Sequence, residues 1–417
     1  MRDVLNAVLS VGVTVAAVTG VGIGATAAAG EPAAPPAGQC AWQGELSPRT
    51  IGQVNFALPD TGAWYWIMPY EVRPGTTITL TGQFPRARYM SFNTYDGRFS
   101  SFTTGGVASA LPDYRIAPDP GTDNPWQHPG GAGTYTVNVT TDPNAPNALA
   151  LSPAGATSGR GYLIFREYLP AGDAASVRPP EVRISDGAGT RTLASCVGDG
   201  NGLLGTVTSA LGEVGISRRD KSSGTTEFRR ASGAGAFPNV DNAYLAATFT
   251  PAADGRVMVV RGRAPKTPGG TEPVVWPPTS GAEVRYFSFC TNLAVLPGPV
   301  VVDTAADGAI DNGCRTDEQT VLDAAGDYTY VVGTEAQRAE IEAIPGATFV
   351  PTSSRHPSTP EAMLIRNMLP TGEFPHAVQN VPVDGTSEEA AAVMGPYYPH
   401  ATLCTIAAVR DGSCPGA

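Results

Sequence analysis

A short segment with alternating side chains carries the residues best suited to chemistry. The segment ARYMSFNTYD at 87–96 combines arginine, serine, asparagine and aspartate with two tyrosines. In a β-strand its side chains alternate between two faces, which places Arg88 on one face and Tyr95 on the other. Arg88 and Arg166 are candidates to bind a carboxylate or a phosphate, because guanidinium forks suit planar anions. The alternative is that each arginine pairs with an aspartate inside the fold.

Aromatic side chains near this segment are candidates for stacking on a sugar ring or another apolar ligand. Together with the two arginines, the predicted ligand-binding residues are Trp64, Trp66, Tyr95 and Trp126. If the chain is an enzyme, Asp96 and Asp113 are the carboxylates expected to act as acid and base on a glycan. The alternative for the tryptophans is that they fill the core of one domain.

A glycine-containing loop offers oxygen ligands for a metal. Asp119, Asp123 and Asn124 lie close together in the sequence, and Ca²⁺ takes six to eight oxygen ligands of this kind. The spacing differs from that of an EF-hand loop. Calcium is therefore the cofactor hypothesis, and the alternative is a turn in which these side chains cap backbone groups.

The histidines add no catalytic motif. His128, His356, His376 and His400 each lie within two residues of a proline, and the sequence contains neither GxSxG nor HExxH. Two classes of function follow. One is a secreted ligand-binding or cell-envelope-associated protein that holds a glycan through its aromatic residues. The other is a secreted carbohydrate-active enzyme that uses a carboxylate pair.

The elements that position these residues occur twice along the chain. Five blocks recur in the same order: 75–85 with 255–265, 88–92 with 285–289, 119–124 with 307–312, 133–139 with 326–332, and 163–170 with 363–370. This alignment places Tyr244 at the position of Trp64, Cys290 at that of Asn93 and Cys314 at that of Trp126. An ordered series of matches indicates an internal duplication.

Each block alternates apolar and polar residues and ends at Gly, Pro, Asn or Asp, which is typical of strands. The predicted fold is all-β, with two tandem antiparallel β-sandwich domains of jelly-roll type and few short helices. The best helical segments are 334–344 and 387–394. The segment at 202–214 is a further short-helix candidate.

The predicted organisation has five parts. Residues 1–29 are typical of a secretory signal, with an apolar stretch followed by small residues at the cleavage region. The other parts are a Pro/Ala linker at 30–39, a first β-sandwich at 40–196, a Gly/Ser-rich linker at 197–239 and a second β-sandwich at 240–417. No later segment is apolar enough to span a membrane once the signal is cleaved.

Six cysteines follow the predicted signal: Cys40, Cys196, Cys290, Cys314, Cys404 and Cys414. An even number in an exported chain indicates three disulfides, and six cysteines allow fifteen pairings. The duplication favours pairing Cys290 with Cys314, because both are present in one repeat and absent from the other. Cys40 with Cys196 would close the first domain, and Cys404 with Cys414 a short C-terminal loop.

The composition and the net charge limit the classes of ligand that the protein is expected to bind. The 417 residues include 49 Gly and 38 Pro, only 16% are charged, and the net charge is −11. A chain this acidic is not expected to follow the phosphates of a nucleic acid. We therefore expect an extracellular or cell-envelope location and an extracellular glycan or small molecule as the ligand.

The motifs of the first repeat resemble those of bacterial DUF1254/DUF1214-type proteins. The matching segments are 84–96, 116–126, 135–137 and 166–170, and the resemblance extends over roughly 62–183. It implies β-sandwich domains and no particular reaction, so it supports the fold and leaves the function open.

Overall fold

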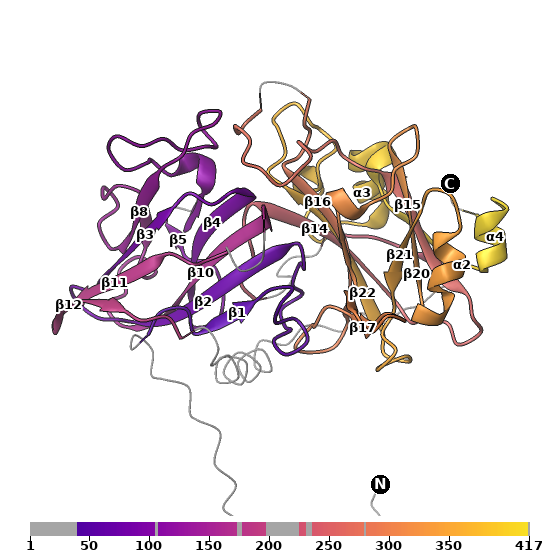
Figure 1. The fold of residues 1–417 in the computed structure, drawn as a ribbon, viewed down its shortest axis with the longest axis horizontal. Coiled ribbons are helices and arrows are strands. Elements are labelled where there is room, and N and C mark those ends of the chain that lie inside the picture. The colour runs from indigo at the N-terminus through magenta and orange to yellow at the C-terminus, as the bar shows by residue number, and fades with distance from the viewer. Residues whose placement is uncertain are drawn as a thin grey trace, which may run out of the picture. The chain divides into compact units, whose positions relative to one another are not determined.

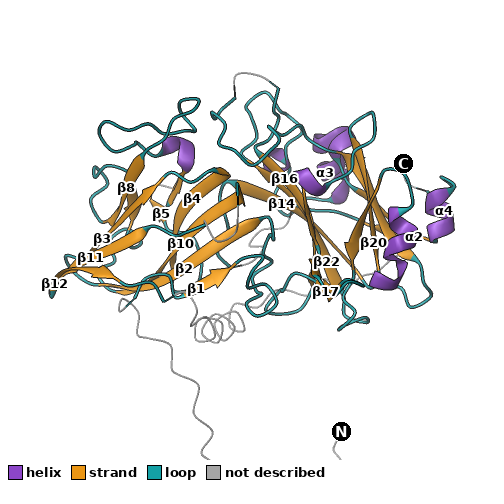
Figure 2. Cartoon of the chain, viewed as in Figure 1, coloured by secondary structure: helices purple, strands orange, loops and turns teal. Residues whose placement is uncertain are grey.

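The computed structural model describes residues 40–104, 107–172, 177–196, 225–230, 236–278 and 281–415. The predicted signal at 1–29, the linker at 30–39 and the helix candidate at 202–214 lie outside these ranges. So do 197–224 and 231–235 of the predicted interdomain linker. The described residues form mostly β-sheets with few short helices (Figures 1 and 2).

The N-terminal part of the chain builds a first pair of sheets, coloured indigo to magenta in Figure 1. One sheet has the order β1-β2-β10-β4-β7: Gly44–Leu46, Ala63–Val72, Gly159–Pro170, Ala87–Asp96 and Ala110–Pro112. The other has the order β12-β11-β3-β8-β9: Gly189–Leu193, Glu181–Asp186, Thr77–Gln83, Thr134–Thr140 and Ala148–Ala150. All neighbours in these two sheets are antiparallel except β8 and β9.

A second pair of sheets follows with a corresponding strand order. One sheet has the order β14-β22-β16-β19: Asn242–Phe249, Glu361–Met368, Tyr286–Leu293 and Cys314–Thr316. The other has the order β13-β23-β15-β20-β21: Thr225–Thr226, His400–Cys404, Val257–Arg263, Asp327–Gly333 and Ala347–Pro351. As in the first pair, the last two strands, β20 and β21, run parallel.

Shorter elements connect these sheets. Two small hairpins are β5 with β6 (Thr103–Thr104, Val107–Ala108) and β17 with β18 (Val302–Thr304, Ile310–Asn312). The helices are α2 (Arg338–Glu342), α3 (Ser387–Met394) and α4 (Ile406–Arg410). Single 3₁₀ turns include η1 (Asp113–Arg115), η3 (Asp317–Gln319), η4 (Glu335–Gln337), η5 (Val378–Asn380) and η6 (Gly395–Tyr397).

Two of the described helices, α2 and α3, lie where the sequence predicted them, whereas α4 was not predicted. The segment 334–344 forms η4 followed by α2, and α3 spans the predicted 387–394. A capping box explains where α3 begins, since Thr386 and Glu389 each bond the backbone N–H of the other. Within the described ranges, no helix has the length and apolar character needed to cross a membrane.

Each pair of sheets encloses an apolar core. In the first pair, residues such as Met90 and Phe165 of one sheet pack with Leu80 and Val137 of the other. In the second pair, Phe289 and Tyr330 stack with ring centroids 4.5 Å apart. Alternation along the strands therefore buries one face of every sheet against its partner.

The opposite faces of the two central sheets are buried as well. Side chains from β2, β4 and β10 meet side chains from β16 and β22 in one cluster: Ala63, Tyr89, Tyr168, Tyr286 and Met368. This contact explains why nearly every residue of β4 and all of β16 are buried, although their sequences contain many polar residues. The repeated Arg-Tyr-x-Ser-Phe segments thus face each other across an internal polar layer.

The structure pairs Cys40 with Cys196, Cys290 with Cys314 and Cys404 with Cys414. These are the predicted pairings, but the alignment that led to Cys290 with Cys314 was wrong at one step. Cys290 lies opposite Cys314 between β16 and β19, and Asn93 lies opposite Ala110 between β4 and β7. The structural counterpart of Cys314 is therefore Ala110, and not Trp126.

The alignment of the strands that carry the tryptophans needs a one-residue correction. Arg166 lies opposite Tyr65, and Arg366 lies opposite Tyr244. Tyr65, rather than Trp64, therefore occupies the position of Tyr244. A shift of one residue moves every side chain of a strand to the other face. The predicted alignment of Trp64 with Tyr244 therefore compared a residue of the apolar core with a residue on the opposite face of the sheet.

The disulfides are expected to contribute unequally to the free energy of unfolding. Cys40 and Cys196 are separated by 156 residues, and Cys404 and Cys414 by 10. Since loop-closure entropy grows with loop length, replacing Cys40 and Cys196 with serine should reduce the free energy of unfolding by about 2 kcal/mol more than replacing Cys404 and Cys414. Urea unfolding followed by circular dichroism measures both losses. Equal losses would contradict the expected dependence on loop length.

Candidate functional site

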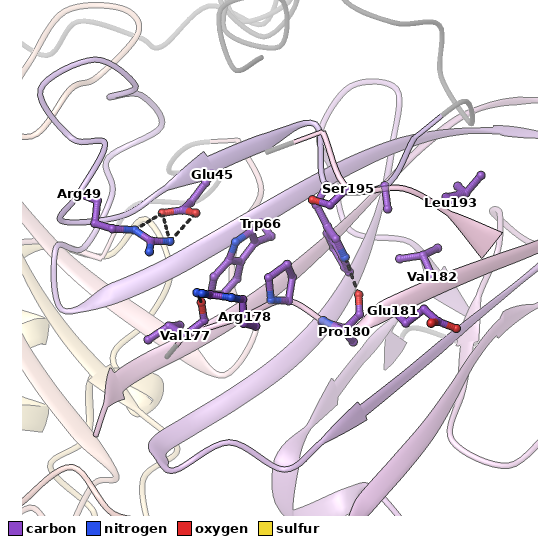
Figure 3. A pocket seen from close by; sticks show the side chains of 13 residues that line it. Glu45, Arg49, Trp66, Val177, Arg178, Pro180, Glu181, Val182, Leu193 and Ser195 are labelled. Atoms are coloured by element: carbon purple, nitrogen blue, oxygen red, sulfur yellow. Dashed lines mark hydrogen bonds and ion pairs between the residues drawn. The ribbon is translucent and has the colours of Figure 1, made fainter. Parts of the chain in front are cut away.

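A cleft opens at the edge of the first pair of sheets, where β1 is the outer strand of one sheet and β12 of the other. Its volume is about 470 Å³. The lining comes from residues within 41–49, from Trp66, and from residues within 177–182 and 193–195 (Figure 3). A volume of this size lies in the range of small-molecule sites.

Apolar side chains make up much of the cleft. Trp42 is held by a hydrogen bond from its indole N–H to the carbonyl of Pro180, at 2.7 Å. Trp66 stacks on Phe165 with a centroid distance of 5.3 Å and an interplanar angle of 23°. Pro179 is half-buried. The cleft therefore enters the core at a point where rigid rings define its walls.

An ion pair borders one end of the cleft. Arg49 binds both carboxylate oxygens of Glu45, with Nη2 at 2.9 Å from Oε1 and 2.8 Å from Oε2. Ser47 also donates to Glu45 Oε1, at 2.6 Å. The guanidinium carbon of Arg49 lies 4.3 Å from the centroid of the Trp64 ring. Ring contact and bidentate pairing together fix the position of this arginine.

Two further polar groups belong to the lining. The indole N–H of Trp66 is buried without a hydrogen-bond partner among the described residues. Arg178 is exposed and donates to the carbonyl of Val177 at 2.9 Å. A buried donor without an acceptor is costly. The lining thus combines apolar surface with groups that can fix the orientation of a polar ligand.

The two carboxylates predicted for catalysis are far apart. Asp96 accepts from the backbone N–H groups of Arg98 and Ser100, whereas Asp113 accepts from that of Met90. Asp96 and Met90 are six residues apart on β4, which places the carboxylates about 20 Å apart at the rise of a strand. Glycoside hydrolysis uses separations of about 5–9.5 Å. Asp96 and Asp113 therefore do not form one catalytic pair in this structure.

Asp113 is instead the partner of an arginine from the second pair of sheets. Arg285 binds it with Nη1 at 2.8 Å from Oδ1 and Nη2 at 2.9 Å from Oδ2, and both side chains are completely buried. Burial raises the pKa of Asp113 to about 6, while Arg285 and the backbone N–H groups of Met90 and Tyr114 oppose that rise. The carboxylate is thus ionised at neutral pH and bound to Arg285.

Arg88 makes the reciprocal contact. Its Nη1 lies 2.8 Å from Asp317 Oδ2, and its Nη2 lies 2.7 Å from Glu318 Oε1, both in η3. Arg285 also donates to the carbonyl of Arg88 at 2.8 Å. The anion-binding role predicted for Arg88 is therefore replaced by an internal ion pair with an aspartate, which was the alternative. This aspartate comes from the second pair of sheets.

The remaining ligand candidates are also internal. Tyr95 is 0% exposed and donates to the carbonyl of Pro238 at 2.9 Å. Trp126 is 0% exposed and donates to the carbonyl of Arg88 at 3.2 Å, while Trp64 is 5% exposed. None of these three presents an open ring face to a ligand. Trp66 is also 0% exposed, but it lines the cleft, and Arg166 lines a second cavity.

The predicted calcium loop uses its asparagine as a structural cap. Asn124 donates to the carbonyls of Asp113 and Ile116 and accepts from the N–H of Trp126. Asp123 is exposed and Asp119 is half-buried. Because Asn124 is fully engaged, the three side chains do not act together as a ligand set in this structure, which corresponds to the turn alternative.

Among the described residues, Asp60, Cys290 and Cys314 form the one cluster of three side chains of metal-ligating type. The two sulfur atoms are joined in a disulfide. A metal requires thiolates, which a disulfide does not provide, so this cluster is not a metal site.

The sequence did not single out one buried acid. Glu167 follows Arg166 on β10, and its residue is 2% exposed. Burial raises the pKa of Glu167 to about 8, so the side chain is mostly protonated at neutral pH. An acidic residue on a strand with two buried faces has no local signature, because the sequence does not reveal the second layer.

Comparisons with known proteins support the fold alone. No family model and no curated protein matches the sequence. A crystal structure of an uncharacterised protein from Burkholderia cenocepacia is similar, with a TM-score of 0.50 and 14% identity over 88% of this chain and 83% of that chain. A protein from Vibrio parahaemolyticus has a TM-score of 0.42 and 12% identity over 83% and 89% of the two chains.

Glu167 predicts a pH-dependent stability. The folded state holds the proton with a pKa of about 8, against 4.5 for an ordinary glutamate, so unfolding releases it between these values. The free energy of unfolding should therefore fall as pH rises from 4.5 to 8, with Glu167 contributing at most about 1.4 kcal/mol per pH unit. Denaturant unfolding across this range should show a shallower decline for Glu167→Gln. The exposed Glu373→Gln variant is the control and should follow wild type, and identical slopes for all three proteins would contradict the assignment.

Proposed function

We propose that this chain is an exported binding protein of the bacterial cell envelope or its surroundings. In this proposal a short glycan binds without turnover in the cleft between β1 and β12. The observation that carries it is the lining of the cleft. Aromatic and proline rings lie beside a fixed ion pair, an exposed arginine and the buried unpartnered indole N–H of Trp66.

The chemistry of a sugar suits such a lining. A pyranose ring has an apolar C–H face and a rim of hydroxyl groups, each of which donates and accepts hydrogen bonds. Half-buried Pro179 supplies apolar surface beside Trp42 and Trp66, which are 1% and 0% exposed, and Arg178 and Glu45 supply charged groups. A ligand that reaches the buried indole N–H of Trp66 offers it a hydroxyl oxygen as an acceptor. Hydrogen bonds to charged groups are the stronger ones, which favours orientation of the ligand.

Binding rather than catalysis is proposed because the buried carboxylate of the lining is already engaged. Glu45 accepts from Arg49 and Ser47, so its carboxylate oxygens already have partners within the protein. A general acid for glycoside cleavage must instead reach the leaving-group oxygen of the ligand with its own carboxyl group.

Three disulfides support export, since disulfides persist in oxidising compartments. The predicted signal at 1–29 is part of the same proposal. We further propose that the two pairs of sheets arose by duplication of one β-sandwich. The matching strand orders β2-β10-β4-β7 and β14-β22-β16-β19 support this origin. Membership of the DUF1254/DUF1214 group is proposed on the sequence motifs, in keeping with the fold shared with an uncharacterised bacterial protein.

Calorimetric titration of the chain from residue 30 onward tests the binding site. A glycan array first selects a short neutral oligosaccharide, with chitotriose as the initial probe. Arg178→Ala should weaken binding about tenfold, which corresponds to about 1.4 kcal/mol and to the loss of one charged hydrogen bond. Arg183→Ala is the matched control, because Arg183 is an exposed arginine on β11 outside the cleft lining, and it should bind as wild type does.

Two results would overturn the proposal. One is the absence of saturable binding to every oligosaccharide on the array. The other is an unchanged affinity in both Arg178→Ala and Trp66→Phe, provided that each variant retains the circular dichroism of wild type. Release of shorter sugars from the bound oligosaccharide would show turnover and would contradict a purely binding role.

A further inference from the structure

A second cavity lies between the two pairs of sheets and has a volume of about 60 Å³. Its lining includes two buried arginines and three tyrosines: Arg166, Arg366, Tyr65, Tyr168 and Tyr244. Arg166 lies on β10 opposite Tyr65, and Arg366 lies on β22 opposite Tyr244. The cavity therefore brings together corresponding positions of the two central sheets.

Arg166 has only neutral partners. Its Nη1 donates to Asn93 Oδ1 at 2.6 Å, and its Nη2 donates to the Tyr95 hydroxyl and the Phe237 carbonyl, both at 2.8 Å. Arg166 is 2% exposed, and its Nε–H is buried without a partner among the described residues. No carboxylate in the described part of the chain lies within ion-pair distance of this guanidinium.

Arg366 has one carboxylate nearby, but at a longer distance. Its Nη1 lies 3.7 Å from Asp60 Oδ2, and its Nη2 donates to the carbonyl of Leu58 at 2.7 Å. The carboxylate of Asp60 accepts shorter hydrogen bonds from Tyr286, at 2.9 Å, and from Ser288, at 2.6 Å. Asp60 therefore supplies one negative charge that is shared among several groups.

The charge of Arg166 has no negative group in contact with it. Both arginines keep their protons at any physiological pH. Burial raises the pKa of Tyr65 to about 12 and that of Tyr168 well above its ordinary value, so neither tyrosine contributes a charge. The carboxylate of Asp241 accepts from Tyr89 at 2.6 Å and interacts with Arg166 only at longer range. A buried guanidinium without a contacting counter-charge is unfavourable.

We propose that this cavity binds a small oxyanion of single negative charge, such as formate, acetate or bicarbonate, between Arg166 and Arg366. The Nε–H of Arg166, which has no partner among the described residues, is a donor for one oxygen of the anion. The cavity volume exceeds the roughly 30 Å³ that one water occupies in the liquid and suits an anion of a few heavy atoms. The bound anion places a negative charge beside Arg166 and joins the two pairs of sheets.

Thermal unfolding of the chain from residue 30 onward tests this site. Sodium formate, acetate and bicarbonate are each titrated against sodium chloride at constant ionic strength and pH. A ligand that binds only the folded state raises Tm in a saturable way. We expect such a rise for at least one oxyanion in wild type. We expect none in Arg166→Gln, which has no charge to neutralise, and a smaller rise in Arg166→Lys, which keeps the charge without the fork.

Arg160→Gln is the matched control. Arg160 is an exposed arginine on the same strand, paired with Glu71 at 3.2 Å, and its variant should respond to the anion as wild type does. The melting temperature of Arg166→Gln in chloride shows whether this variant folds. If it does not, Tyr244→Phe provides the second test, because it removes one hydroxyl from the cavity lining and should shift the half-saturating anion concentration.

Three results would overturn the proposal. The first is a wild-type Tm that depends on ionic strength but not on the identity of the anion. The second is an equal oxyanion response in wild type and in folded Arg166→Gln. The third, used where Arg166→Gln does not fold, is an unchanged half-saturating concentration in Tyr244→Phe. The first result would mean that the ring contacts of Arg166 with Tyr65 and Tyr95, each at 5.7 Å, are sufficient to hold its charge.

Discussion

The exchange of two arginines between the pairs of sheets is the interaction on which the rest of the structure depends. Arg88 extends from the first pair to Asp317 in the second, and Arg285 extends from the second pair to Asp113 in the first. Arg88 lies on β4 and Arg285 immediately precedes β16, and both strands supply core residues. An ion pair in such a buried place is favourable only when both partners are present and hydrogen-bonded. The contact therefore fixes how the two halves meet.

This arrangement explains why the interior contains so many polar groups. The central sheets are covered on both faces, so the hydroxyls, amides and guanidiniums of β4, β10, β16 and β22 must find partners across the layer. Arg88 and Arg285 do so with carboxylates, whereas Arg166 does so with neutral groups. The layer thus serves as a scaffold, and the open cleft lies at the far edge of the first pair of sheets, lined by Trp42 and Glu45.

The sequence predicted the strands well, because residue types still alternate along strands that are buried on both faces. It also led to the observed cysteine pairs. Presence in only one repeat indicated Cys290 with Cys314, although Cys314 was aligned with the wrong residue, and closure of the first domain and of a short C-terminal loop indicated the other two. The sequence could not identify the partners of Arg88, because Asp317 is 229 residues away in the other half of the chain. The cleft was missed for a similar reason. Its walls come from 41–49 and 177–195, and no local pattern connects segments that meet only at a sheet edge.

A double-mutant cycle on Arg285 and Asp113 tests the central claim most directly. Chemical unfolding would compare wild type, Arg285→Ala, Asp113→Ala and the double variant. Each single substitution leaves a buried charge unpaired, so each should reduce the free energy of unfolding by about 3–5 kcal/mol. The double variant should lose clearly less than the sum of the two, because partners in contact couple. If the two losses add within about 0.5 kcal/mol, the arginine exchange does not hold the two halves together.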